Sequence, residues 1–167
     1  MAKTIIGVMG AGNLATAQDL ELAYLLGQAI AKNNWILLTG GRNVGVMDAA
    51  SRGAKANDGL VVGILPGKDK TSMSEAVDIA IVTDLGNARN NINVLSADVI
   101  ITCGIGLGTA SEIALALKNN KPVILLQPTE LTYEFFASLT DKFLFSAETV
   151  EKAIALIQEI LTNSKQT

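Results

Sequence analysis

Histidine is absent from the 167-residue sequence, and cysteine occurs only once, as Cys103. Without histidine, the chain cannot use Ser-His or Cys-His catalysis or bind a metal through imidazole. A single cysteine excludes an intrachain disulfide and a zinc site of several cysteines. The strand pattern begins almost at the N-terminus and no signal peptide is seen, so we expect a reducing, cytoplasmic environment. Aromatic residues make up only 4% of the chain, which is too few for an extended base-stacking surface.

Charged residues are also scarce, at 17%, and the net charge is −3. A mildly acidic chain has no general attraction for nucleic acid or anionic lipid, so we expect neither as a partner. The apolar runs, such as 61–65 and 99–102, are strand-sized and fall short of the roughly 18 residues that a membrane span needs. With 49% hydrophobic residues, the chain is predicted to fold as a single domain over residues 1–162, with a frayed tail at 163–167.

Apolar runs typical of strands alternate with longer helical patterns. Continuous apolar stretches such as Val99–Ile101 favour a parallel sheet that is covered on both faces. Strict alternation of strand and helix predicts the α/β class, as a doubly wound, Rossmann-like parallel sheet with helices on both faces. The predicted strands are 4–9, 35–39, 60–65, 79–82, 99–102 and 123–126. The predicted helices are 17–32, 46–56, 87–95, 110–118 and 147–161, with a helical turn near 133–138.

Glycines follow the ends of several predicted strands, in loops that lead into helices. In an open parallel sheet these loops meet at the carboxyl edge, where ligands bind. Glycine lets the backbone approach an anion, and the helix that follows presents free N–H groups to it. The glycines could instead only form tight turns, but three convergent loops favour a phosphate or oxyanion site. The candidate ligand-binding residues in these loops are Gly10, Gly12, Asn13, Gly40, Gly41, Arg42, Asn43, Gly45, Gly106, Gly108 and Thr109.

Two nucleotide-binding motifs fit the sequence less well. The first loop contains Gly10-x-Gly12-x-x-Ala15, a form of the dinucleotide fingerprint. That motif requires an acidic residue at the end of the second strand, whereas this strand ends Leu37-Leu38-Thr39-Gly40. A nicotinamide-dependent dehydrogenase is therefore disfavoured. The sequence also lacks Gly-x-x-x-x-Gly-Lys-Ser/Thr, which disfavours a P-loop nucleotidase.

Three charged side chains lie in or beside these loops. Glu112 follows Thr109 at the spacing of a capping box, which favours a helix cap over a role as general base or ligand-orienting group. Arg89 stands at a predicted helix start, where a cation is unfavourable, so we expect it to contact a phosphate or to pair with Glu112 rather than lie in solvent. Arg42 is either a second anion ligand or an exposed loop residue.

Taken together, several segments resemble a known family. They are Thr39–Met47, Val62–Pro66, Arg89 nine residues before Asp98, and Gly104-x-Gly106-x-Gly108-Thr109-x-x-Glu112. The series is similar to the family once labelled "possible lysine decarboxylase". Its members include the cytokinin-activating nucleoside 5′-monophosphate phosphoribohydrolases and the molybdenum cofactor carrier proteins. The resemblance covers about residues 5–126.

The chain departs from the phosphoribohydrolase pattern at several positions. Gly104 and Ile105 stand where that branch has Pro and Gly, Arg42 replaces a third glycine, and Asn90 replaces a lysine after the arginine. These departures resemble the molybdenum cofactor carriers. The resemblance therefore implies that the chain binds this cofactor, a phosphate-bearing pterin dithiolene with a molybdenum oxo centre, as cargo. It would protect the cofactor before delivery to molybdoenzymes, and no catalytic metal is implied.

On this interpretation the glycine loops and Arg89 would hold the phosphate, and Arg42 with Asn43 would reach molybdate or pterin oxygens. The resemblance also implies an alternative, N-glycosidic cleavage of AMP-like nucleotides, with Glu112 activating water and Arg89 orienting it and the phosphate. A nucleotide sensor is a less favoured third reading. Because family members are dimers or tetramers, we expect a homo-oligomer, with helices 87–95 and 110–118 as candidate interfaces.

Overall fold

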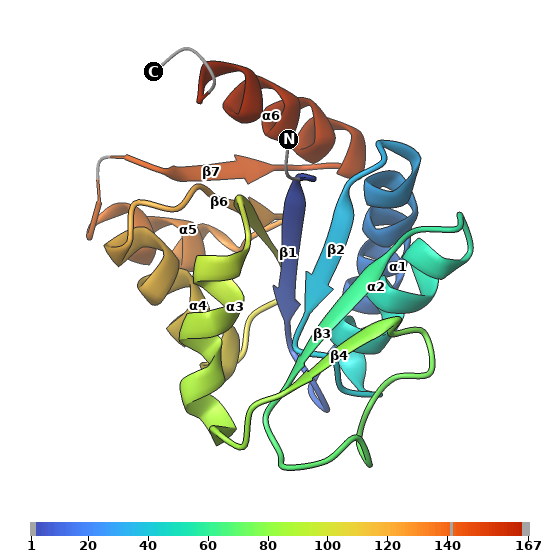
Figure 1. Ribbon diagram of the computed structural model, residues 1–167. Helices are drawn as coiled ribbons and strands as arrows, with labels where there is room; N and C mark the ends of the chain where they lie inside the picture. Colours follow the sequence, from blue (N-terminus) through green and yellow to red (C-terminus); the bar gives the residue numbers. More distant parts are fainter. Residues whose placement is uncertain (1–2, 141, 165–167) are drawn as a thin grey trace.

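The computed structural model of the chain describes residues 3–140 and 142–164. In this part of the chain, seven strands form one sheet in which all neighbours are parallel, in the order β4-β3-β2-β1-β5-β6-β7 (Figure 1). The strands are β1 (Ile5–Gly10), β2 (Ile36–Thr39), β3 (Val61–Leu65), β4 (Ile79–Val82), β5 (Val99–Cys103), β6 (Val123–Leu126) and β7 (Leu144–Ala147). The predicted doubly wound, Rossmann-like α/β fold is confirmed.

Helices cover both faces of the sheet, as α1, α2 and α6 on one and α3, α4 and α5 on the other (Figure 1). Strand residues alternate between the two faces, so Ile6 and Val8 pack in the first core and Met9 and Ile100 in the second. The helices are α1 (Ala17–Lys32), α2 (Gly45–Lys55), the 3₁₀ turn η1 (Gly86–Arg89), α3 (Asn90–Ser96), α4 (Leu107–Lys118), α5 (Glu130–Ala137) and α6 (Val150–Asn163).

The predicted elements differ from the observed ones mainly at their ends. The strand β7 was not predicted, and the predicted helix 147–161 begins at the last residue of this strand. In the structure Ala147 ends β7, and the Thr149 hydroxyl caps α6 by accepting from the backbone N–H of Lys152 at 3.2 Å. The predicted helix 87–95 is a 3₁₀ turn that continues into α3. The domain boundary at residue 162 stays a prediction, and 165–167 of the predicted tail lie outside the described residues.

Within residues 3–140 and 142–164, no helix combines the length and the hydropathy that a membrane-spanning segment needs. The same residues contain no group of three or more histidine, cysteine, aspartate or glutamate side chains placed to hold a metal ion.

Candidate functional site

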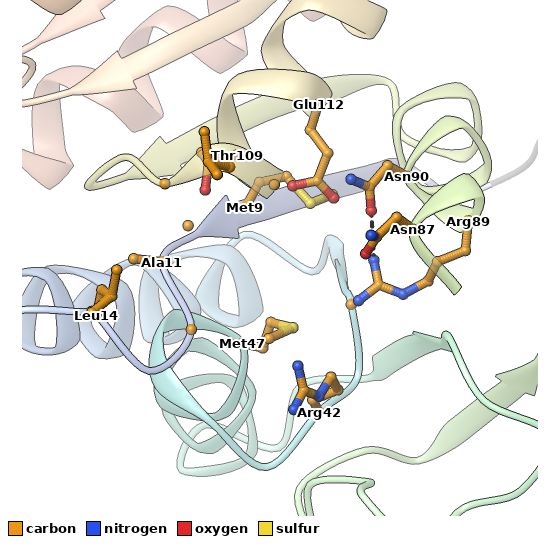
Figure 2. Close-up of a pocket in the computed structure, with 16 residues that line it drawn as sticks. Met9, Ala11, Leu14, Arg42, Met47, Asn87, Arg89, Asn90, Thr109 and Glu112 are labelled. Carbon is orange, nitrogen blue, oxygen red and sulfur yellow. Dashed lines mark hydrogen bonds between the residues drawn. The ribbon is translucent and has the colours of Figure 1, made fainter. Parts of the chain in front are cut away.

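A pocket of about 250 Å³ lies at the carboxyl ends of β1, β2 and β5. The strands β1 and β5 are neighbours, and the helices that follow them, α1 and α4, cover opposite faces of the sheet. Ligands bind at such a switch point in open α/β sheets. Thr109 and Glu112 from α4 line one wall, and Arg42 and Met47 line the wall across from it (Figure 2).

The structure brings most of the predicted site residues to this pocket. Those that line it are Gly10, Gly12, Gly40, Arg42, Arg89, Gly106, Gly108, Thr109 and Glu112. Asn13, Gly41, Asn43 and Gly45 do not. Asn13 is exposed, and the backbone N–H of Asn43 donates to the carbonyl of Ser72 at 2.8 Å. Gly41 and Gly45 have φ values of 74° and 58°, so both serve to turn the loop. Contact with a ligand stays a prediction for every candidate residue, whether or not it lines the pocket.

The helix α4 begins at the pocket with uncapped backbone amides. Its N-cap is Gly106, and no side chain caps it, whereas Thr16, Thr129 and Thr149 cap α1, α5 and α6 with their hydroxyls. The first N–H groups of a helix have no acceptor within the helix, and the helix dipole adds positive potential there. These amides are therefore available to an anionic ligand.

The expectation that Thr109 and Glu112 cap the helix is wrong. The helix begins at Leu107, so both residues lie inside it. The Thr109 side chain is 2% exposed, and its Oγ1 has no hydrogen-bond partner among the described residues. Glu112 instead accepts a hydrogen bond through Oε1 from Asn93 Nδ2 at 2.8 Å. Both side chains line the pocket, and the Thr109 hydroxyl is left for a ligand.

Arg89 lies against the pocket as a buried cation, 8% exposed. Its Nη1 donates to Asn90 Oδ1 at 2.9 Å, while its Nε has no partner in the described part of the chain (Figure 2). The expected pairing with Glu112 is not present as an ion pair within 4.0 Å. Burial lowers the pKa of Arg89 and Arg42 lowers it further, while Glu112 opposes the shift. A buried guanidinium with a free donor is suited to bind an oxyanion.

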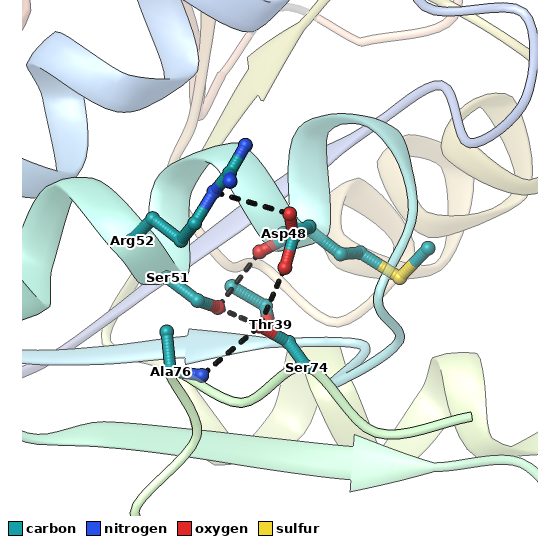
Figure 3. A network of polar contacts seen from close by, with 7 residues as sticks. Thr39, Asp48, Ser51, Arg52, Ser74 and Ala76 are labelled. Carbon is teal, nitrogen blue, oxygen red and sulfur yellow. Dashed lines mark hydrogen bonds and ion pairs between the residues drawn. The ribbon is translucent and has the colours of Figure 1, made fainter. Parts of the chain in front are cut away.

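Arg42 lies in a loop that the β3–β4 connection holds in place. The Arg42 backbone pairs with Met73 in an isolated antiparallel bridge, and the N–H of Ser74 donates to the carbonyl of Gly41 at 2.9 Å. The Ser74 hydroxyl in turn donates to Asp48 Oδ1 on α2 at 2.6 Å (Figure 3). Contacts outside the pocket therefore hold the backbone at Arg42 in place.

Ser74→Ala is expected to loosen this loop. The variant loses the hydroxyl that donates to Asp48 and that accepts from the N–H of Ala76 at 3.2 Å. At about 0.5–1.5 kcal/mol for each hydrogen bond, we expect a loss of about 1–3 kcal/mol in the free energy of unfolding. Thermal unfolding followed by circular dichroism measures this. Ser72→Ala is the matched control, since it keeps the carbonyl that Asn43 contacts, and equal melting temperatures for both variants would contradict the prediction.

Glu112→Gln is expected to raise the melting temperature at pH 7. Burial raises the pKa of Glu112, against the opposing effects of Asn93 and Arg89, so folding favours the protonated carboxyl. That stabilisation is complete below the unfolded-state pKa and is lost as the pH rises through the higher folded-state pKa. Glutamine stays neutral and keeps an oxygen for Asn93. Calorimetry should show the variant above the wild type at pH 7 and the difference closing toward pH 4; a constant difference would contradict this account.

Sequence reasoning missed part of the pocket wall. Asn87 and Asn90 flank Arg89 in the chain, and Asn90 also donates through Nδ2 to the Ser111 hydroxyl at 2.8 Å. The sequence signal that could have identified them was their position next to Arg89, which was already expected to contact an anion. The remaining residues are apolar, and periodicity assigns such residues to strands or helices without distinguishing core from pocket. They are Met9, Ala11, Leu14, Met47 and Leu107.

The chain is similar to two groups of known proteins. The molybdenum cofactor binding protein from Rippkaea orientalis is 62% identical, with a TM-score of 0.95 over 96% of this chain and 99% of that chain. The molybdenum cofactor carrier protein from Chlamydomonas reinhardtii is 49% identical, with a TM-score of 0.92 over the same shares. A cytokinin riboside 5'-monophosphate phosphoribohydrolase from Mycobacterium tuberculosis is more distant, at 31% identity over 74% of this chain and 70% of that protein.

A family model also matches most of the chain, in agreement with the resemblance seen in the sequence. The SLOG cluster4 family matches residues 3–154, a range that includes every strand of the sheet and the whole pocket. The chain therefore belongs to the SLOG cluster4 family.

Proposed function

We propose that the chain binds the molybdenum cofactor and carries it in a protected form. The supporting observation is the pocket itself, where Arg42, Arg89 and the uncapped start of α4 surround one space of about 250 Å³. A terminal phosphate and a molybdenum oxo centre both require hydrogen-bond donors and positive potential. The protein from Rippkaea orientalis, 62% identical, binds this cofactor, and the one from Chlamydomonas reinhardtii carries it.

The other side chains of the pocket are compatible with an anionic cargo. Burial raises the pKa of Glu112, which lessens the negative charge that faces such a cargo. The side chains of Met9, Met47 and Leu14 give the pocket an apolar part. Apolar walls limit the access of water to the bound molecule. Arg89 would hold the phosphate together with the glycine loops, and Arg42 would contact oxygens of the molybdenum centre.

Retention of molybdenum tests the proposal. The purified chain is mixed with molybdenum cofactor released from a molybdoenzyme, desalted, and analysed for molybdenum by mass spectrometry. About one molybdenum per chain is expected to remain with the wild type. If desalting removes all molybdenum, the proposal is wrong.

A phosphoribohydrolase is the second candidate, because Arg89 and Glu112 line one pocket and a relative at 31% identity has that activity in its name. In this case Glu112 would activate water for attack on the N-glycosidic bond of an AMP-like nucleotide. To test for this activity, the purified protein is incubated with AMP and the release of free adenine is followed by chromatography. Release no faster than with Glu112→Ala would remove the second candidate and leave the carrier.

We further propose that the chain forms a homodimer or homotetramer and delivers its cargo to molybdoenzymes in the cytoplasm. Leu85, Leu95 and Leu107 are 49%, 46% and 95% exposed, and they leave apolar surface beside η1, α3 and α4 that a second copy would cover. Light scattering after size exclusion reports the mass in solution, and a monomer at micromolar concentration would contradict the oligomer.

A further inference from the structure

A second cavity, of about 270 Å³, lies beside the arginine pocket. The β5–α4 loop separates the two, since Gly104 and Ile105 line the second cavity while Gly106–Gly108 line the first. Leu14 lines both, and its side chain is 85% exposed. The two cavities are therefore neighbours around a single leucine.

The second cavity has the opposite electrostatic character. Neither arginine nor lysine is among its lining residues, and its charged group is the carboxylate of Asp19. Asp19 Oδ2 accepts from the N–H of Thr16 at 2.9 Å, and no described residue donates to Oδ1. The carboxylate lies directly against Gly104, where an added Cβ would be 2.6 Å from Asp19 Cγ. Such a cavity disfavours an anion and favours a neutral group that donates N–H hydrogen bonds.

The volumes of the two cavities favour a single ligand that occupies both. Pockets that hold a drug-sized ligand enclose about 300–1,000 Å³, and each of these cavities is smaller than that. Together they fall within the range. Apolar side chains such as Ile105, Ile113 and Leu126 add apolar contact surface to the second cavity.

We propose that the second cavity binds the neutral bicyclic end of the cofactor, the pterin, while the arginine pocket binds its anionic end. Asp19 Oδ1 accepts N–H groups from the amino-pyrimidinone edge of the pterin, and Leu14 packs on the part of the ligand that crosses between the cavities. This assignment rests on the proposed function, because it divides the same cargo between two subsites of opposite charge preference.

The test measures the two ends separately. The probe for the second cavity is 6-hydroxymethylpterin, a neutral fluorescent pterin, and the probe for the first is molybdate. Thr132→Phe places a ring in the second cavity from the first turn of α5, and it is expected to weaken pterin binding at least tenfold and leave molybdate binding unchanged. Asp19→Asn keeps an oxygen for the N–H of Thr16, so α1 stays capped, and it is expected to weaken pterin binding about tenfold.

Leu131→Phe is the matched control, because Leu131 is 77% exposed on the same turn and lines neither cavity. Saturating molybdate should leave pterin binding in place. Displacement of the pterin by molybdate, pterin binding unaffected by Thr132→Phe, or no pterin binding by the wild type would each overturn the assignment. The carrier function has a separate outcome, since a wild type that retains molybdenum keeps that proposal even if the pterin lies elsewhere.

Discussion

Arg89→Met is expected to release the molybdenum cofactor on desalting while the fold remains intact. The guanidinium is the buried cation of the arginine pocket, with a free Nε. Hydrogen bonds to a charged group contribute about 1.5–3 kcal/mol, so their loss weakens binding about 10- to 100-fold. Methionine has a similar length and no charge, and it fits a buried position.

Two effects on stability oppose each other in this variant. Methionine removes a buried cation whose Nε is unpaired, which favours folding, but it also leaves Asn90 Oδ1 without its donor. We therefore expect a melting temperature close to that of the wild type. Arg52→Met is the matched control, since Arg52 is exposed and pairs with Asp48 at 3.2 Å outside the pocket. The control should retain molybdenum, and full retention by Arg89→Met would show that Arg89 does not hold the cargo.

The sheet was predictable because strand and helix patterns repeat strictly and the strands are continuously apolar. Every predicted strand from 4–9 to 123–126 is present within one residue of its ends. The strand β7 was missed because a run as short as Leu144–Ala147 has no periodicity that separates a strand from the approach to a helix. It became a strand because β6 offered an edge on which to pair, a tertiary effect.

The position of the pocket in the fold was predictable from the sequence, but only some of the contacts within it were. Parallel topology alone brings the three glycine loops to one edge. The role of Glu112 was misjudged because the capping-box spacing is satisfied equally well inside a helix, and the start at Leu107 depends on the extended backbone of Gly106. Glu112 contacts Asn93 instead of its own helix start, and Asn93 lies 19 residues before Glu112 in the chain, so no local signal predicts this contact.

The uncapped start of α4 leads to the second large expected effect, that of Gly106→Asp. Gly106 has extended backbone, with φ −146° and ψ 176°, which any residue adopts. An added Cβ would meet only Ala11, at 4.0 Å. Aspartate is among the best N-cap residues and also interacts favourably with the helix dipole, by about 0.3–1 kcal/mol. We therefore expect the variant to melt slightly above the wild type.

The carboxylate of the new aspartate accepts hydrogen bonds from the amides that the cargo needs, and it repels the phosphate of the cargo. Gly106→Asp is therefore expected to retain no molybdenum. Gly106→Asn caps the helix without adding a charge and should retain an intermediate amount of molybdenum, so comparing the two variants separates the effect of capping from the effect of charge repulsion. Gly67→Asp adds the same charge at a glycine with open surroundings outside the pocket, and it should retain molybdenum fully. A melting temperature at or above that of the wild type, together with loss of molybdenum, would show that this helix start is left uncapped for an anionic ligand, and retention of molybdenum by Gly106→Asp would remove that explanation.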